Sequence, residues 1–254
     1  MSAGVDAHCH LDRIDAPLAD VIARARAVGV GGAVIAAADP ADQSRLRRIA
    51  RETGCAWVVG VHPWWAQDAD ALDHVRALAG MQHAHGIGEC GLDFRRAGTE
   101  AARERQRVVL RPQLALAAER RLPVVLHCVR AWQVLRDELA GFDLAGGMVH
   151  GWSGGPEQTR SVLSAGLHVS VGPDVLRSAK ARAGAGSVPL DRLLVESDAP
   201  DRPVAGAAHG EPAHAALVAR ALAEDRSMTT EQLLAVTGAN ARRLLRYSSR
   251  WASS

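Results

Sequence analysis

Paired cysteines, long apolar runs and an excess of one charge are all missing from this sequence, and each absence excludes a class of protein. The four cysteines are Cys9, Cys55, Cys90 and Cys128, and none belongs to a Cys-x-x-Cys pair, so neither a zinc ribbon nor a disulfide framework is predicted. No apolar run approaches the ~18 residues of a membrane span, and the first residues lack the basic-then-apolar pattern of a signal peptide. We therefore expect a cytoplasmic protein with reduced thiols and no membrane partner.

The charges of the chain are nearly balanced. Lys and Arg together number 30, Asp and Glu number 28, and the net charge is +2, so bulk charge does not indicate a nucleic-acid or membrane surface. The Arg-rich stretches 45–48 and 103–107 have helical context, where a solvated helix face is the expected meaning. No segment indicates an obligate protein partner.

Short apolar runs alternate with longer amphipathic ones, as they do in βαβ units. The predicted strands are 3–8, 31–37, 56–61, 84–88, 122–126, 146–149, 167–171 and 192–196. The predicted helices are 16–28, 41–53, 68–80, 100–120, 131–140, 156–165, 174–183, 211–224 and 229–246. This alternation and the length of 254 residues predict one α/β domain over residues 1–254. Its expected architecture is a single TIM-like (β/α)8 barrel, with room for distortion of the ring.

Residues with metal-binding side chains stand at or just past the ends of the predicted strands. They are His8, His10, Glu89, His127, His150 and Asp198. A β/α barrel collects such residues from many strands at one face. Because His8 and His10 are two residues apart, both point to the same side of a strand. We therefore expect the six side chains to converge at one mouth.

The chemistry of this set indicates one or two divalent metal ions. A carboxylate can bridge two cations with its two oxygens, whereas an imidazole offers one lone pair, so Glu89 is the expected bridge. Asp198 is predicted to be both a ligand and the general base for a metal-activated water. A His-rich site fits Zn, Mn, Ni or Co, while Mg prefers more oxygen ligands. Glu196 is in phase with Asp198 and is a candidate partner behind the ligands.

Five further residues are predicted to bind substrate. They are His62, Arg95, Arg130, Trp152 and Arg202. Guanidinium groups match phosphate oxygens, an imidazole can hydrogen-bond a phosphate, and indole rings can stack on bases. Each residue also has a structural alternative, and for Trp152, as for Trp64 and Trp65, it is simple coverage of the barrel top.

Seven motifs together resemble the TatD-type metal-dependent hydrolases, a branch of the amidohydrolase-like TIM barrels. They are Asp6–Asp12, Gly60–Pro63, Ile87–Asp93, Leu122–His127, Val149–Gly154, Leu194–Pro200 and Asn240–Arg242. The resemblance implies that His8, His10, Glu89 and Asp198 hold one metal and that Glu89, His127 and His150 hold a second. It also implies hydrolysis of phosphodiester bonds, commonly in DNA, with magnesium or another divalent cation.

The chain departs from that family pattern near the expected substrate. Arg130 stands one residue later after His127 than in the family, Gly210 replaces the Asn of an Asn-Glu-Pro motif, and Asp201-Arg202 replaces an aromatic residue. Two alternatives therefore stay open, a small-phosphoester hydrolase and an amide, lactone or ester hydrolase on the same barrel. The only lysine, Lys180, is in a predicted helix, so no strand-end lysine is available to bridge metals as in many amidohydrolases. A non-catalytic binding protein is disfavoured because the ligand set is complete.

Overall fold

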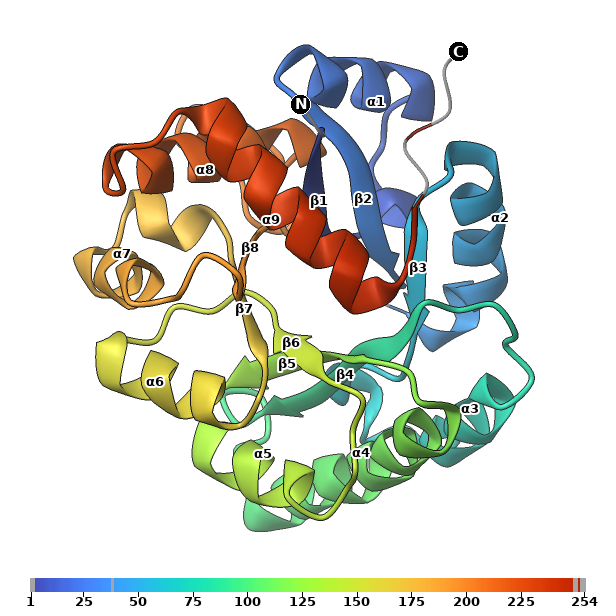
Figure 1. Ribbon diagram of the computed structural model, residues 1–254. Coiled ribbons are helices and arrows are strands. Elements are labelled where there is room, and N and C mark those ends of the chain that lie inside the picture. The colour runs from blue at the N-terminus through green and yellow to red at the C-terminus, as the bar shows by residue number, and fades with distance from the viewer. Residues whose placement is uncertain (1–2, 38, 249–250, 252–254) are drawn as a thin grey trace.

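The computed structural model describes residues 3–37, 39–248 and 251. Within these residues one parallel sheet holds eight strands in chain order: β1 (Gly4–Cys9), β2 (Val30–Ala36), β3 (Ala56–Val59), β4 (Gly86–Asp93), β5 (Val124–Val129), β6 (Gly147–Val149), β7 (His168–Val171) and β8 (Leu193–Val195). The helices between them are α1 (Leu18–Ala27), α2 (Gln43–Thr53), α3 (Ala71–Leu78), α4 (Glu100–Arg120), α5 (Trp132–Leu139), α6 (Pro156–Ser164) and α7 (Ala179–Gly186). α8 (Ala215–Glu224) and α9 (Thr230–Leu245) follow β8. Figure 1 shows the helices arranged around the strands, which confirms the predicted (β/α)8 barrel.

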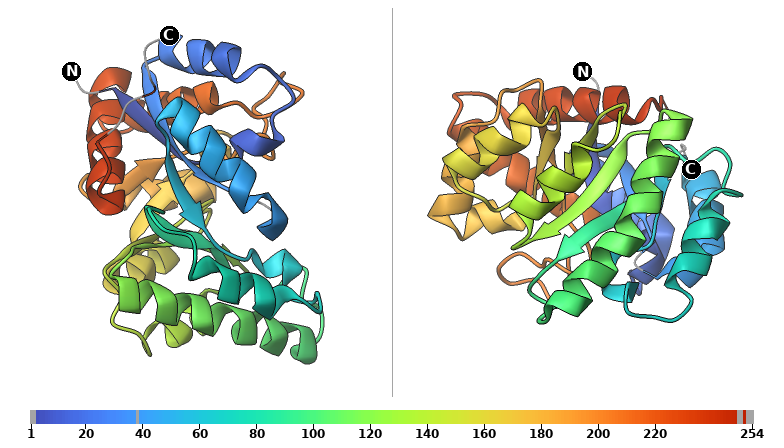
Figure 2. Two further views of the ribbon diagram at one scale, coloured as in Figure 1. Left: turned by 90° about the vertical axis from the view of Figure 1, so that its right-hand side faces the viewer. Right: turned by 90° about the horizontal axis from the view of Figure 1, so that it is seen from below.

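Two layers of apolar side chains hold the barrel together. Side chains such as Ile35 and Leu126 face outward and pack beneath the surrounding helices, while Val34 and Val125, their neighbours in the strands, fill the interior. This alternation is the two-residue period of a strand. At one end α9 crosses the ring, as Figures 1 and 2 show. Its Leu245 side chain joins the interior layer. The carboxyl ends of the strands lie at the opposite end, where the site described below is found.

The ring closes where the first strand meets the segment that follows the last. The amide of Asp198 donates to the His8 carbonyl at 3.0 Å, and the amide of His10 donates to the Ala199 carbonyl at 2.8 Å. Beneath them the buried Asp6 carboxylate accepts from the Ser197 amide at 2.8 Å. These contacts hold the two ends of the sheet together directly below the mouth.

Two of the predicted elements differ clearly from the sequence-based expectation. The predicted helix over 174–183 is wrong, because residues 173–176 form a short 3-10 turn and α7 begins only at Ala179, where the Ser178 hydroxyl accepts from the Ala181 amide. β4 runs to Asp93 rather than ending at residue 88. Its register with β5 is interrupted between Gly88 and Cys90, which is how an inserted residue changes the direction of the next side chain.

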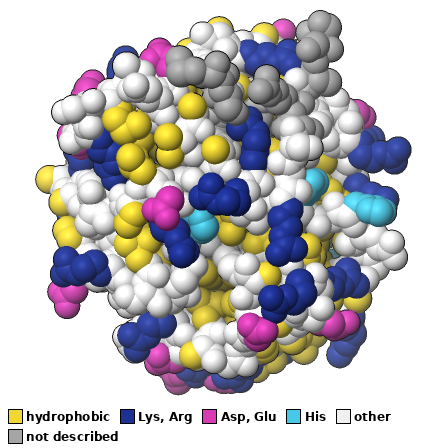
Figure 3. All heavy atoms as spheres, in the orientation of Figure 1, with side chains coloured by type: hydrophobic (Ala, Val, Ile, Leu, Met, Phe, Trp, Pro, Cys, Tyr) yellow, Lys and Arg dark blue, Asp and Glu magenta, His cyan; other side chains and the backbone are white. Residues whose placement is uncertain are grey.

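The surface charges are mixed, as the balanced composition predicts, and the cysteines are unpaired in the structure. On the face drawn in Figure 3, Lys and Arg side chains are scattered among apolar and acidic ones rather than gathered in one band. All four cysteines are free thiols, and Cys9 and Cys90 lie in the outer apolar layer, facing away from the mouth. In the described part of the chain, the structure contains no helix of the length and apolarity that a membrane crossing needs. Residues 1–2, 38, 249–250 and 252–254 of the predicted 1–254 domain lie outside the described residues.

Replacement of Asn240 by Ala is expected to destabilise the fold. The buried Asn240 amide donates to the Leu190 and Leu193 carbonyls at 2.7 and 2.9 Å, so it fastens α9 to the start of β8. Removing it leaves the buried Leu193 carbonyl and the partly buried Leu190 carbonyl without this donor, at a cost of about 1–3 kcal/mol in the free energy of unfolding. Urea denaturation of the two proteins measures the difference.

The control for this substitution is Arg220→Ala, which removes an exposed side chain from α8. Its free energy of unfolding should stay within about 0.5 kcal/mol of the parent value. Equal stability of Asn240→Ala and the control would show that α9 is held to β8 by apolar packing alone.

Candidate metal centre

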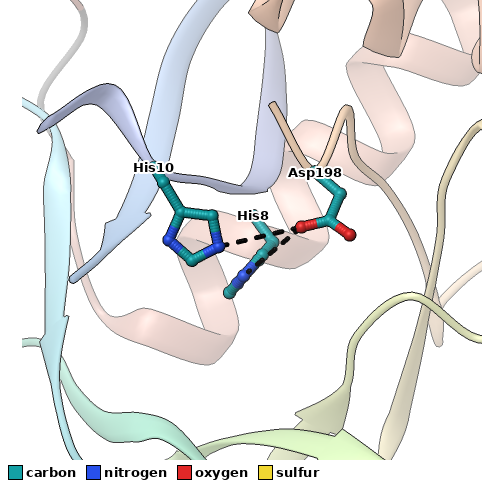
Figure 4. Close-up of side chains that lie close together, drawn as sticks. All are labelled: His8, His10 and Asp198. Atoms are coloured by element: carbon teal, nitrogen blue, oxygen red, sulfur yellow. Dashed lines mark ion pairs between the residues drawn. The ribbon is translucent and has the colours of Figure 1, made fainter. Parts of the chain in front are cut away.

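Two imidazoles of the site come from the end of β1. The His10 Nδ1 atom lies 2.8 Å from the Ala36 carbonyl. Because a carbonyl only accepts, this nitrogen is the donor and Nε2 keeps its lone pair for the site. His8 Nε2 and His10 Nε2 lie 3.9 and 3.8 Å from Asp198 Oδ1. Figure 4 shows these three side chains pointing toward one another across the closing seam of the barrel.

Glu89 is at the middle of the whole cluster. Its Oε1 atom lies 2.8 Å from both His127 Nδ1 and His150 Nε2 and 3.0 Å from His62 Nε2. Its Oε2 atom lies 3.1 Å from His8 Nε2 and 3.6 Å from His10 Nε2. Each carboxylate oxygen therefore faces a separate group of imidazoles, which is the arrangement that a bridging carboxylate needs.

The sheet register explains why these histidines meet. Gly91 of β4 pairs with His127 of β5, and Leu126 of β5 pairs with Val149 of β6. His127 directly follows Leu126 and His150 directly follows Val149, so the two histidines lie at the same level along the barrel axis. The interruption in β4 lets Glu89 face inward while Cys90 faces the outer layer. Pairing between neighbouring strands thus sets the spacing of the ligands.

Burial and mutual charge shift the ionisation of the cluster. Burial would raise the pKa of Glu89, but the imidazoles around it, His150 first, hold that pKa well below its ordinary value. Burial raises the pKa of Asp198 to about 6, and burial lowers the pKa of His10 and His62 to about 4. Burial also opposes charge on His150, but the nearby Glu89 raises its pKa well above the ordinary value. The buried Glu89 carboxylate is thus stabilised by several imidazoles at once.

The donor set fits divalent cations. Both ring nitrogens of His8 and the Oε2 atom of Glu89 are buried without a hydrogen-bond partner in the described residues, and such atoms normally have one. Four triplets place their ligand atoms within 4.8 Å of one another: His8, His10, Asp198; His8, Glu89, His150; His62, Glu89, His127; and His150, Glu196, Asp198. Imidazole and carboxylate are ligands for Zn, Mn, Ni, Co and Mg.

Two carboxylates face the outer ring nitrogens of His127 and His150. Asp93 Oδ2 lies 3.5 Å from His127 Nε2. Glu196 Oε1 lies 3.5 Å from His150 Nδ1 and accepts from the Gly151 amide at 2.6 Å, while its other oxygen is hydrogen-bonded to the Ser170 hydroxyl. Carboxylates in this position fix the orientation of metal-binding imidazoles and raise their basicity.

The structure brings only some of the predicted substrate residues to the cluster. His62 lies inside it, 3.2 Å from His127. Arg202 reaches its edge, donating to Asp174 at 2.8 Å and lying 3.4 Å from Asp198. Arg95 and Arg130 are exposed.

Trp152 is not brought to the cluster. It is 6% exposed, its indole donates to the Thr159 hydroxyl at 2.9 Å, and its ring packs edge-on against Trp132. Its faces are therefore in the barrel wall rather than open to a base.

Three residues of the mouth were not assigned from the sequence. Asp93 is the last residue of β4, Arg96 follows that strand, and Asp174 accepts from Arg202. Asp93 was missed because the predicted strand ends at residue 88, whereas β4 continues to Asp93. No strand periodicity marks Arg96 or Asp174, since both lie in loops or turns.

A (β/α)8 barrel with imidazoles and carboxylates at the carboxyl ends of its strands is the arrangement that metal-dependent hydrolases of this fold use. The chain belongs to one family within that class, the TatD related DNases, whose model matches residues 5–246. It is 31% identical to the "uncharacterized metal-dependent hydrolase YabD" of Bacillus subtilis, over 95% of this chain and 98% of that protein. It is 33% identical to the "3'-5' ssDNA/RNA exonuclease TatD" of Pantoea vagans, over 89% and 92%.

A solved structure is similar over nearly the full length. The TatD homologue YJJV from Escherichia coli superposes with a TM-score of 0.86 at 30% identity, covering 96% of this chain and 98% of that one. The expected resemblance to the TatD-type hydrolases is thereby confirmed. This chain is a metal-dependent hydrolase of that family.

Replacement of Glu196 by Gln is expected to weaken metal binding. The glutamine would present an NH2 group to the Gly151 amide or to the Ser170 hydroxyl, and it would withdraw the charge beside His150. Loss of such a supporting carboxylate lowers metal affinity about 10–100-fold. Titration of metal-free protein with Mn²⁺ against a competing chelator measures the change.

Glu157→Gln, on the exposed side of α6, is the matched control. An unchanged affinity in Glu196→Gln would mean that His150 is oriented without this carboxylate.

Metal affinity should fall as the pH falls through about 6. The pKa of Asp198 is raised to about 6 and that of His150 is raised further above its ordinary value, so both groups bind protons that a cation must displace. Below this range the protonated forms dominate, and the apparent affinity for Mn²⁺ should drop by at least about tenfold between pH 7 and pH 5. Calorimetric titration in two buffers of different ionisation enthalpy counts the released protons. A constant affinity over this pH range with no proton release would contradict the assignment of Asp198 and His150 as metal ligands.

Proposed function

We propose that this chain is a phosphodiesterase that removes nucleotides from single-stranded nucleic acid with the help of two divalent ions. The observation that carries the proposal is Glu89, whose two oxygens face separate imidazole groups. The names of its TatD relatives support a nucleic-acid substrate. A site with two ions suits phosphodiesters, because it can stabilise both the attacking and the leaving oxygen.

The ligands divide into two sets that share Glu89. The first set would be His8, His10, Glu89 and Asp198, and the second Glu89, His127 and His150, with His62 3.0 Å from Glu89 beside it. When bound, the ions would lower the pKa of a coordinated water and neutralise charge on the phosphoryl oxygens.

The protein groups at the mouth would then move the proton and hold the phosphate. Asp198 is buried, its pKa is raised to about 6, and it would accept the proton of the attacking water. Arg202, 3.4 Å from Asp198, can donate to a phosphate oxygen once it turns from Asp174. Arg95 and Arg130 are exposed and would contact phosphates farther along the strand.

We further infer a single hydrolase domain in a reducing, cytoplasmic setting. The packing of α9 against β1 and β8 supports one domain, because the end of the described chain returns to its beginning. Four free thiols support a compartment that keeps cysteine reduced.

The decisive measurement is hydrolysis of a single-stranded DNA oligomer beside a small phosphodiester. Metal-stripped protein should be inactive and added Mg²⁺ or Mn²⁺ should restore cleavage of both substrates. Glu89→Gln should reduce the rate at least about 100-fold, because the bridging charge is lost at the reacting centre. The matched control is Glu119→Gln on the exposed side of α4, which should keep full activity.

Each other result points to a different substrate. Hydrolysis of the small phosphodiester without DNA cleavage would replace the nuclease by a small-phosphoester hydrolase. Inactivity on both substrates in metal-loaded protein would refute the phosphodiesterase and direct the search to amides, lactones and esters.

A further inference from the structure

An exposed aromatic ring stands beside the metal centre. Trp64 follows His62 and Pro63 in a 3-10 turn after β3, and it is 39% exposed. Among the large hydrophobic side chains that are exposed in the described residues, it is the aromatic one. Its ring centroid is 4.6 Å from that of His62 and 6.3 Å from that of His127. A ligand held against Trp64 would therefore lie next to the imidazoles of the cluster.

The ring of Trp64 is fixed by polar contacts rather than by burial. Its indole nitrogen donates to Asp93 Oδ2 at 2.8 Å, and its amide donates to His62 Nδ1 at 3.1 Å. Asp93 is itself held, because its other oxygen accepts from the Arg95 and Arg96 amides at 3.0 and 3.1 Å. Asp93 thus links the ring to His127 as well. An aromatic side chain that is both exposed and held in one orientation is prepared to stack on a ligand.

A guanidinium group lies on the same ring. The centre of the Arg96 guanidinium is 3.6 Å from the centroid of Trp64, and Arg96 has no carboxylate partner among the described residues. Arg103, a short distance along the chain, also lies over an aromatic ring, that of Phe94, but it is paired with Glu100. The positive charge of Arg96 is therefore left for an anion from outside. A stacked indole and guanidinium together form a flat cationic surface.

We propose that Trp64 and Arg96 form a nucleobase subsite, which binds the base of the nucleotide whose phosphodiester lies at the metal centre. The inference rests on the proposed nuclease function and specifies how its substrate is held. The base stacks on the Trp64–Arg96 surface, and the free N–H groups of Arg96 donate to the neighbouring phosphate. Every base has a π-face, so the subsite accepts any sequence but requires a base.

The test compares an ordinary single-stranded DNA oligomer with one of the same length whose three terminal nucleotides at each end are abasic tetrahydrofuran analogues. Both carry the same phosphates, so only stacking distinguishes them. For the parent enzyme KM should be about tenfold lower for the base-bearing oligomer, while kcat should differ by less than about threefold. Fluorescence anisotropy of the labelled oligomers on metal-free protein gives the same comparison for binding alone.

The variants separate stacking from structure. Trp64→Leu should abolish the preference for bases, Arg96→Ala should reduce it, and Trp64→Phe, which keeps a ring but loses the hydrogen bond to Asp93, should retain most of it. Arg103→Ala is the matched control, since it removes an arginine from a neighbouring aromatic ring and should leave the preference unchanged. A loss of kcat with an unchanged preference in Trp64→Leu would show that Trp64 only supports Asp93 and would overturn the subsite.

The remaining outcomes distinguish the two proposals. Equal KM and equal binding of the two oligomers by the parent enzyme would overturn the subsite and leave the nuclease standing. Base-dependent binding without cleavage of either oligomer would support the subsite and refute the nuclease. Neither binding nor cleavage would refute both.

Discussion

Two backbone hydrogen bonds, from the Asp198 amide to the His8 carbonyl and from the His10 amide to the Ala199 carbonyl, join the first strand of the barrel to the segment after the last. The residues that make these bonds also carry ligands of the candidate centre, so closing the ring and assembling the site are one event. The ligands of β1 and β8 are separated by nearly the whole barrel in sequence. The first set, which joins His8 and His10 to Asp198, can bind a cation tightly only when these two ends of the sheet are brought together. Metal binding should therefore couple to the folding of the entire domain rather than to one segment.

The charges in the cluster explain how it is stable before a cation binds. Glu89 is buried and ionised, and an isolated buried carboxylate would be very costly. Protonated imidazoles beside it offset that cost, since the pKa values of His127 and His150 are raised. These protons occupy the role that cations take in the loaded enzyme. The same groups thus serve the empty and the occupied site, and the exchange of protons for metal makes the centre sensitive to pH.

The features that follow from strand period were predictable, and those that depend on loop contacts were not. The pairing of His8 with His10, and the level positions of His127 and His150, follow from parallel strands ending at one edge. The continuation of β4 to Asp93 could not be read in the same way, because glycines at 88 and 91 break the apolar pattern of a strand. The true start of α7 depends on the Ser178 cap, which propensity alone does not separate from the turn before it. The burial of Trp152 depends on Trp132 and Thr159 from neighbouring segments, a tertiary contact that no local pattern encodes.

The differences from the family pattern lie in the loops around the mouth. They change side chains that would meet the substrate. At the end of β8 an aromatic residue is replaced, and Arg202 instead places a cation near Asp198. On the other side of the centre, after β3, Trp64 supplies an exposed ring with Arg96 stacked on it. The buried ligands are constrained by the register of the sheet, whereas loop residues can exchange an aromatic for a cation without disturbing that register. The positions of the metal ligands are therefore fixed by the barrel itself, whereas the residues that would meet the substrate lie in loops outside that register.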